Sequence, residues 1–189
     1  MDVQTRIGMP LDEFIRAWET SPFELVNGHV IPHLPRVAIH AVVQTNLFRV
    51  LLEQCGSRGE VNIGGGFISV DEHDRVIEAY DPAVSFYSSV RWQAYTQITP
   101  NWLDKPLMFA PDVAALIVGR DDRFEDVDVV SEGYLRQGVK LLWIIKAQSH
   151  EINVLTGNLL QRLTARDLLT GGDVLPGFSV PVADVFPKA

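Results

Sequence analysis

Two almost wholly apolar segments, separated by a helical pattern, constrain the fold of this chain more than any other feature. Residues 112–119 (DVAALIVG) and 139–145 (VKLLWII) both have the composition of a strand that is buried on its two faces. The residues between them, 124–137, have the pattern of a helix that ends at Gly138. Parallel neighbours in a sheet need a long crossover, which is usually a helix. We therefore predict a parallel strand pair joined by this helix.

The other patterns also mix helices and strands. Apolar residues recur at helical spacing over residues 11–18 and again over residues 37–53. An Asn-Gly pair inside residues 23–31 (FELVNGHVI) predicts a tight hairpin. A second hairpin is predicted near the C-terminus, from residues 151–155 and 159–163.

Two further strands are predicted between the second helix and the first apolar strand. Residues 60–70 carry the triplet Gly64–Gly66, which indicates a bulge, and residues 76–86 carry Pro82, which indicates an edge or a bulge. Residues 87–109 then form a long aromatic linker, which we expect to pack on its own aromatic side chains. The predicted core order is helix, three strands, helix and strand, with a hairpin on either side.

Composition and charge limit the classes of function. The 189 residues carry 16 Lys and Arg against 24 Asp and Glu, so the net charge is −8, and no basic cluster suited to nucleic-acid phosphates is visible. The single cysteine excludes a disulfide framework and a multi-cysteine zinc site. No apolar run is long enough to span a membrane, and the first residues do not resemble a secretory signal. We expect one cytoplasmic domain over residues 1–189 that does not associate with membranes.

Five phrases of the chain resemble, in order, those of a bacterial family of putative restriction endonucleases, abundant in cyanobacteria, within the PD-(D/E)XK nuclease superfamily. The phrases lie at residues 23–31 (FELVNGHVI), 81–87 (DPAVSFY), 110–119 (APDVAALIVG), 133–147 (GYLRQGVKLLWIIKA) and 168–186 (LLTGGDVLPGFSVPVADVF). The resemblance implies an α/β (α+β) fold with a restriction endonuclease-like αβββαβ core, a mixed central sheet, an N-terminal hairpin and a C-terminal hairpin. It also implies hydrolysis of DNA phosphodiesters with Mg²⁺ held by carboxylates and assisted by a lysine.

The residues that this chemistry needs are largely replaced. The family phrase RPDVSFV has an aspartate after its proline, whereas this chain has Ala83. The phrase APDLVVEVLS has a glutamate where this chain has Leu116, and the usual superfamily lysine would lie at Val118. The family often moves that lysine to the next helix, at the position of Val130. No D-x-K or E-x-K sequence occurs anywhere in the chain.

Three acidic residues remain as candidates for a displaced catalytic site: Glu24, Asp81 and Asp112. Asp81 and Asp112 are the candidate metal ligands, because Mg²⁺ prefers carboxylate oxygens. A purely structural role is the alternative for each residue. Glu24 would then bond hairpin amides, Asp81 would begin a turn with the proline that follows it, and Asp112 would start a strand.

The sequence therefore leaves three hypotheses. In the first, the chain has lost nuclease catalysis, needs no cofactor and serves as a homodimeric binding or assembly module. In the second, it is an Mg²⁺-dependent DNA endonuclease that uses the displaced carboxylates, and only then is DNA a partner. In the third, it contacts an active homologue or another protein through residues 87–109.

Overall fold

The computed structural model describes residues 8–33, 36–120, 122–157 and 159–188. Within these ranges the α-helices and short 3₁₀ turns are α1 Leu11–Thr20, α2 Ala38–Cys55, α3 Ser89–Ile98, α4 Phe124–Arg136, η1 Trp102–Asp104 and η2 Val182–Val185. The strands are β1 Met9–Pro10, β2 Phe23–Val26, β3 His29–Pro32, β4 Gly59–Ile63, β5 Phe67–Val70, β6 Arg75–Tyr80, β7 Val84–Ser88, β8 Val113–Val118, β9 Leu141–Lys146, β10 Glu151–Thr156, β11 Leu159–Leu163, β12 Leu168–Gly171 and β13 Leu175–Pro181.

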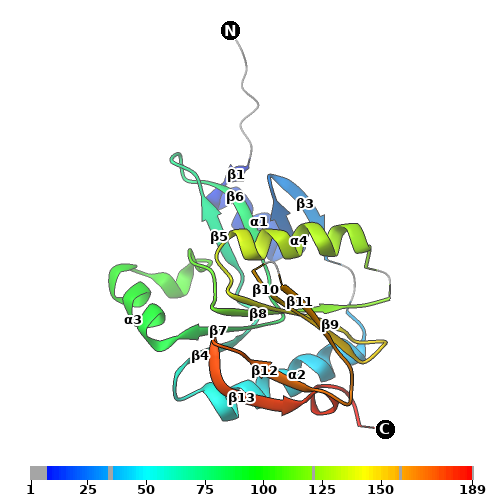
Figure 1. The fold of residues 1–189 in the computed structure, drawn as a ribbon. Coiled ribbons are helices and arrows are strands. Elements are labelled where there is room, and N and C mark those ends of the chain that lie inside the picture. Colours follow the sequence, from blue (N-terminus) through cyan, green and yellow to red (C-terminus); the bar gives the residue numbers. More distant parts are fainter. Residues whose placement is uncertain (1–7, 34–35, 121, 158, 189) are drawn as a thin grey trace.

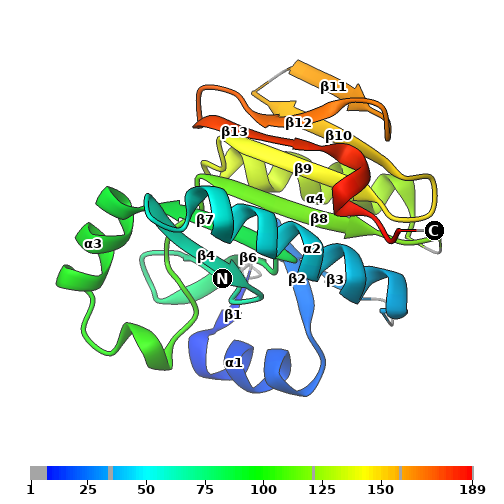
Figure 2. The same ribbon diagram turned by 90° about the horizontal axis from the view of Figure 1, so that it is seen from below.

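The central sheet is mixed, as the sequence predicts. Its strand order is β11-β10-β9-β8-β7-β4, in which β8 and β9 are parallel and the other neighbours are antiparallel. Helix α4 is the crossover between β8 and β9, so the predicted parallel pair is confirmed. The two helices α2 and α4 lie on opposite faces of this sheet (Figures 1 and 2).

Alternation of side chains along the buried strands supplies both faces with apolar residues. Ala115 and Trp143 belong to the core beneath α2, together with side chains of β13 and η2. Their neighbours Ala114 and Leu142 belong to the core beneath α4. Because successive side chains of a strand point to opposite faces, one pair of strands can pack against a helix on each face of the sheet.

A second sheet carries the predicted N-terminal hairpin. Its order is β1-β6-β2-β3, and β5 is a further antiparallel partner of β6 outside this order. The hairpin turns at Asn27 and Gly28, whose φ angles of 50° and 76° are those that an Asn-Gly turn supplies at low cost. Helix α1 packs Phe14 against Phe23 on one face of this sheet, with ring centroids 5.5 Å apart.

The predictions of two continuous strands at residues 60–70 and 76–86 are wrong. Each segment contains two strands that belong to different sheets: β4 and β7 pair in the central sheet, whereas β5 and β6 pair in the second. The chain crosses between the sheets at Gly64–Gly66, where Gly64 and Gly65 have φ angles of 66° and 75°, and again at Asp81–Ala83. A proline cannot donate to a strand ladder, so Pro82 fits such a crossing.

Residues 87–109 contain α3 and η1 and are not an irregular linker, but the predicted aromatic packing is confirmed. Tyr95 stacks on Phe109 with ring centroids 4.3 Å apart, and Trp92 meets Trp102 edge to face at 5.2 Å.

The C-terminal hairpin of β10 and β11 is also confirmed. The further hairpin of β12 and β13 was not predicted. None of the helices in the described ranges has the length and apolar character needed to cross a membrane.

The contact between α4 and β6 gives a prediction on stability. A Cβ atom at Gly133 would collide with the hydroxyl group of Tyr80 and would lie 2.9 Å from two of its ring carbons. Gly133→Ala should therefore lower the free energy of unfolding by about 2 kcal/mol through overpacking. At an exposed helical site the same change would be stabilising by about 1 kcal/mol. Urea unfolding measures the change, with the exposed Glu132→Ala as the control, and a stabilised Gly133→Ala would contradict the packing described.

Candidate functional site

A pocket of about 670 Å³ opens where the two sheets, α2 and α4 meet. Ala83, Leu116, Val118 and Val130, the four residues at the replaced family positions, all line it. Glu24 lines the same pocket. Positions from three separate segments of the sequence therefore face one volume, and all four carry apolar side chains.

Strand register explains how these residues come together. Val84 of β7 pairs with Ala115 of β8, so Ala83 lies beside Leu116 one residue further along the ladder. The amide of Ala83 donates to the carbonyl oxygen of Ala115 at 2.9 Å, which holds the crossing segment against the sheet. Leu116 and Val118 lie on the face of the central sheet against which α4 packs. Val130 of α4 therefore lies in the same apolar cluster as these two residues.

Glu24 is a buried acid at the wall of the pocket. It belongs to β2 and is 6% exposed. Its Oε1 accepts hydrogen bonds from the Tyr134 hydroxyl at 2.9 Å and from the backbone amide of Asp81 at 3.3 Å. These donors belong to α4 and to the crossing segment, so the expectation that Glu24 bonds hairpin amides is wrong. Burial raises the pKa of Glu24 to about 7, although both hydrogen bonds favour the charged form.

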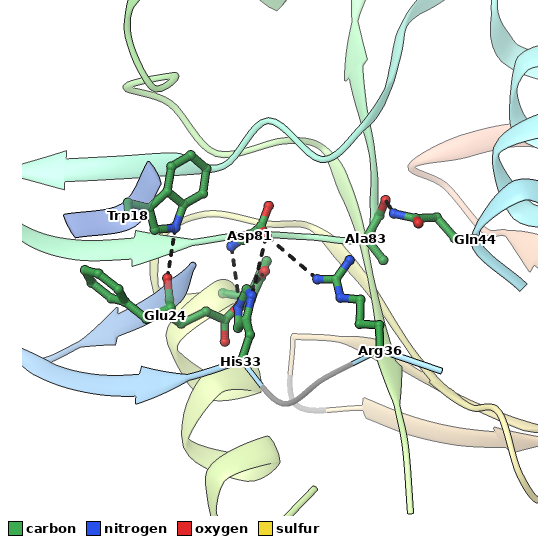
Figure 3. A network of polar contacts seen from close by, with 9 residues as sticks. Trp18, Glu24, His33, Arg36, Gln44, Asp81 and Ala83 are labelled. Atoms are coloured by element: carbon green, nitrogen blue, oxygen red, sulfur yellow. Dashed lines mark hydrogen bonds and ion pairs between the residues drawn. The ribbon is translucent and has the colours of Figure 1, made fainter. Parts of the chain in front are cut away.

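Asp81 lies in the crossing segment and faces the imidazole of His33 and the guanidinium of Arg36 (Figure 3). Its Oδ2 is 3.6 Å from Nδ1 of His33 and 3.7 Å from Nη2 of Arg36. Burial raises the pKa of Asp81, while His33 and Arg36 oppose the rise. Burial also lowers the pKa of His33, and the nearby Asp81 carboxylate opposes that change. The result is a compact charged cluster at the pocket wall, with Arg36 half exposed.

Asp112 lies outside the pocket and is held in a cluster of its own. Its carboxylate is 2.7 Å from Nζ of Lys140 and 3.0 Å from Nη1 of Arg91, and it accepts a hydrogen bond from the Ser88 amide at 2.8 Å. Burial tends to raise the pKa of Asp112, but these partners outweigh it and the pKa is lowered. Asp112 immediately precedes β8, as the structural alternative predicts.

The structure thus brings Glu24 and Asp81 together and leaves Asp112 elsewhere. The ladder places Asp112 opposite Tyr87, six residues along the chain from Asp81. Six residues of strand span about 20 Å. The expected gathering of three carboxylates, with Asp81 and Asp112 as ligands of one metal ion, is therefore not what the structure has.

Sequence reasoning missed several polar residues of the pocket. Gln44 of α2 donates from Nε2 to the carbonyl oxygen of Ala83 at 2.7 Å. His40 is 9% exposed, and its Nδ1 has no hydrogen-bond partner among the described residues. Tyr134 and Arg36 contact the two acids from elements that are distant in the sequence. No local motif marks these residues, because their positions follow from the packing of α2 and α4.

Comparison with known proteins agrees with the fold and the phrases of the sequence. A family model named Uma2, described as a putative restriction endonuclease, matches residues 11–183. The structure is similar to the crystal structure of a putative nuclease belonging to DUF820 from Anabaena variabilis, with a TM-score of 0.74 and 16% sequence identity. That match covers 94% of this chain and 97% of the other. A search of curated proteins found no match.

The donor set of the pocket does not fit the magnesium ion that the family resemblance implies. Mg²⁺ needs near-octahedral oxygen ligands at about 2.0–2.1 Å. The side chains of Ala83, Leu116 and Val118 offer no ligand atom, and Asp81 already faces His33 and Arg36. Across the described ranges, no group of three or more His, Cys, Asp and Glu side chains is arranged to hold a metal ion.

The raised pKa of Glu24 predicts a specific pH dependence of stability. Native Glu24 stays protonated up to about pH 7, whereas an ordinary glutamate ionises near 4.5. The native state therefore binds more protons in this window, and raising the pH costs the wild type up to about 3 kcal/mol. Glu24→Gln removes this cost, so its stability relative to wild type should rise between these pH values and then level off. Chemical unfolding across the pH range measures it.

The exposed Glu125→Gln variant is the matched control for this experiment. Its stability relative to wild type should not change across the same pH range, because its carboxyl group is solvated. A pH-independent difference between Glu24→Gln and wild type would contradict the burial of Glu24.

The Asp112 cluster predicts a structural role for that residue. Asp112→Asn weakens the contacts to Lys140 and Arg91 and should lower the free energy of unfolding by about 2 kcal/mol. Asp184→Asn, which alters an exposed ion pair with Lys188 at 3.9 Å, should cost less than about 0.5 kcal/mol. Equal effects of the two substitutions in urea unfolding would show that Asp112 is not an anchor.

Proposed function

The chain belongs to the Uma2 family of restriction endonuclease-like proteins, and we propose that this member has lost metal-dependent cleavage of DNA and uses the former catalytic pocket for binding. One observation carries the proposal: the replaced positions Ala83, Leu116, Val118 and Val130 all face the pocket. Isolated losses could be compensated by neighbours, but here the floor of the pocket is apolar throughout.

The chemistry of phosphodiester cleavage explains why these replacements matter. A hard cation must be held against the scissile phosphate by carboxylates, and a positive group must stabilise the charge that develops. No lysine lines the described pocket. The guanidinium of Arg36 already lies 3.7 Å from Asp81. Without carboxylates placed to clamp a metal ion and without a lysine, the pocket lacks the parts with which this chemistry lowers the barrier.

The two remaining acids of the inner pocket are poorly suited to replace that clamp. Glu24 has a pKa of about 7, so an appreciable part of it is neutral at neutral pH and does not act as an ionised ligand. Its Oε1 is occupied by the Tyr134 hydroxyl and the Asp81 amide. These contacts occupy one of its two oxygens, so Glu24 has a single oxygen left for a metal ion.

Assembly is the second part of the proposal. Helix α3 and η1 form an aromatic-rich projection at residues 87–109 on one side of the molecule (Figure 1). Val90, Ile98 and Leu103 are exposed on it at 80%, 78% and 77%. Exposed apolar side chains of this size suit a protein contact better than a nucleic-acid contact. A homodimer or another protein partner would cover them.

A displaced-carboxylate nuclease is the competing function. The observation that favours it is that Glu24 and Asp81 line one pocket and are joined by the hydrogen bond from the Asp81 amide. In that case Mg²⁺ or Mn²⁺ would support cleavage, and the activity would depend on both residues.

A cleavage assay separates the two functions. Purified protein is incubated with plasmid and oligonucleotide DNA in the presence of Mg²⁺ or Mn²⁺, and we predict no cleavage above a buffer control. Cleavage that is lost in both Glu24→Gln and Asp81→Asn would overturn the proposal and establish the nuclease.

Restoring the carboxylates tests the same proposal from the opposite side. The double variant Ala83→Asp with Leu116→Glu should bind Mn²⁺ at least about tenfold more tightly than wild type in calorimetry, since two oxygen ligands then face the pocket. The neutral double variant Ala83→Asn with Leu116→Gln is the matched control and should gain little affinity. Tight Mn²⁺ binding by the wild type would contradict the proposal.

A further inference from the structure

The pocket has the dimensions and the wall chemistry of a small-molecule site. Its volume of about 670 Å³ lies within the range of about 300–1,000 Å³ that is usual for such sites. The apolar part of the wall comes from the hairpin, β8 and α4, with Ile31, Leu116, Val118, Val127 and Val130. A ligand that fills this volume must therefore have an apolar body.

The buried part of the pocket wall contains an acidic side chain without a cationic partner, that of Glu24. Both hydrogen bonds to its carboxyl group are accepted by Oε1. No group among the described residues donates a hydrogen bond to Oε2. Oε2 is also absent from the fully buried side-chain atoms that lack a hydrogen-bond partner, so it is not completely enclosed. Oε2 thus keeps some exposed surface, and since Glu24 lines the pocket, it is the carboxyl oxygen left for a ligand.

The charges around the pocket leave Glu24 unbalanced. Asp81 is matched by Arg36, with His33 beside it. The remaining charged side chains of the lining are two acids and two arginines: Asp122, Asp126, Arg120 and Arg123. These four cancel in formal charge, so the ionised pocket carries one negative charge in excess. Glu24, Asp122 and Asp126 all lack a basic neighbour within 4.0 Å among the described residues, and Glu24 is the buried one of the three. Burial raises the pKa of Glu24, and the more distant charge of Arg36 offsets only part of that rise.

We propose that the pocket binds an organic monocation, a primary ammonium group on an apolar body, with the ammonium donating to Oε2 of Glu24 and the apolar body packing on Leu116, Val118 and Val130. A single ammonium donor fits better than a guanidinium fork, since a fork needs both carboxylate oxygens and Oε1 already accepts two hydrogen bonds. This ligand rests on the proposed function, because a metal ion held by family carboxylates would take the same space.

Calorimetry with three compounds of one shape tests this proposal: 2-phenylethylamine, 2-phenylethanol and phenylacetate, which are cationic, neutral and anionic. At slightly alkaline pH, where Glu24 is ionised, the amine should bind at least about tenfold more tightly than the alcohol, and the anion should bind most weakly. Equal binding of amine and alcohol, or no binding of the amine, would overturn the proposal with the wild type alone.

Two variants locate the effect within the pocket. Glu24→Gln should abolish the preference for the amine over the alcohol and leave the binding of the alcohol unchanged. Asp126→Asn removes the same formal charge from a half-buried position of the lining on α4 and should keep the preference within about twofold. An unchanged preference in Glu24→Gln would overturn the assignment of Glu24. If the wild type neither binds the amine nor cleaves DNA, only the proposed ligand is refuted. If the wild type cleaves DNA, the proposed function is refuted.

Discussion

The ladder between β7 and β8 is the constraint on which the rest of the site depends. It pairs Val84 with Ala115 and so places the crossing segment, with Asp81 and Ala83, at the end of the central sheet. A shift of one residue would turn every side chain of β8 to the other face. Because apolar residues occupy both faces of β8, α2 and α4 fix this register together. The character of the pocket thus follows from which side chains the register presents.

Buried acids on the second sheet join that sheet to α4. Glu24 accepts the Tyr134 hydroxyl at 2.9 Å, and Glu78 accepts the Tyr80 hydroxyl at 2.5 Å and pairs with Arg136 at 2.9 Å. The rings of Tyr80 and Tyr134 lie 4.6 Å apart between these acids. Removing one partner of such a network leaves a buried polar group unsatisfied. Glu24 therefore has a structural reason to be present in a chain that lacks the family carboxylates at positions 83 and 116.

Local sequence patterns predicted most elements but not where the chain changes sheets. Apolar runs and the Asn-Gly pair were sufficient for β8, β9 and the N-terminal hairpin. Gly64–Gly66 and Pro82 indicate irregularities within strands, but a local pattern does not state which sheet a strand joins. The replaced positions Ala83 and Leu116 were found from the family phrases. The partners of Asp81 and Asp112 were not, because ion pairs such as that of Asp112 with Lys140 depend on tertiary packing.

Anomalous diffraction from crystals soaked in Mn²⁺ tests the central claim most directly. If the catalytic centre of the family has become an apolar pocket, the anomalous map should contain no peak between Ala83, Leu116 and Glu24. Crystals of the double variant Ala83→Asp with Leu116→Glu, soaked in the same way, provide the positive control. A strong peak in the wild type, coordinated by the carboxylates of Glu24 and Asp81, would contradict the account.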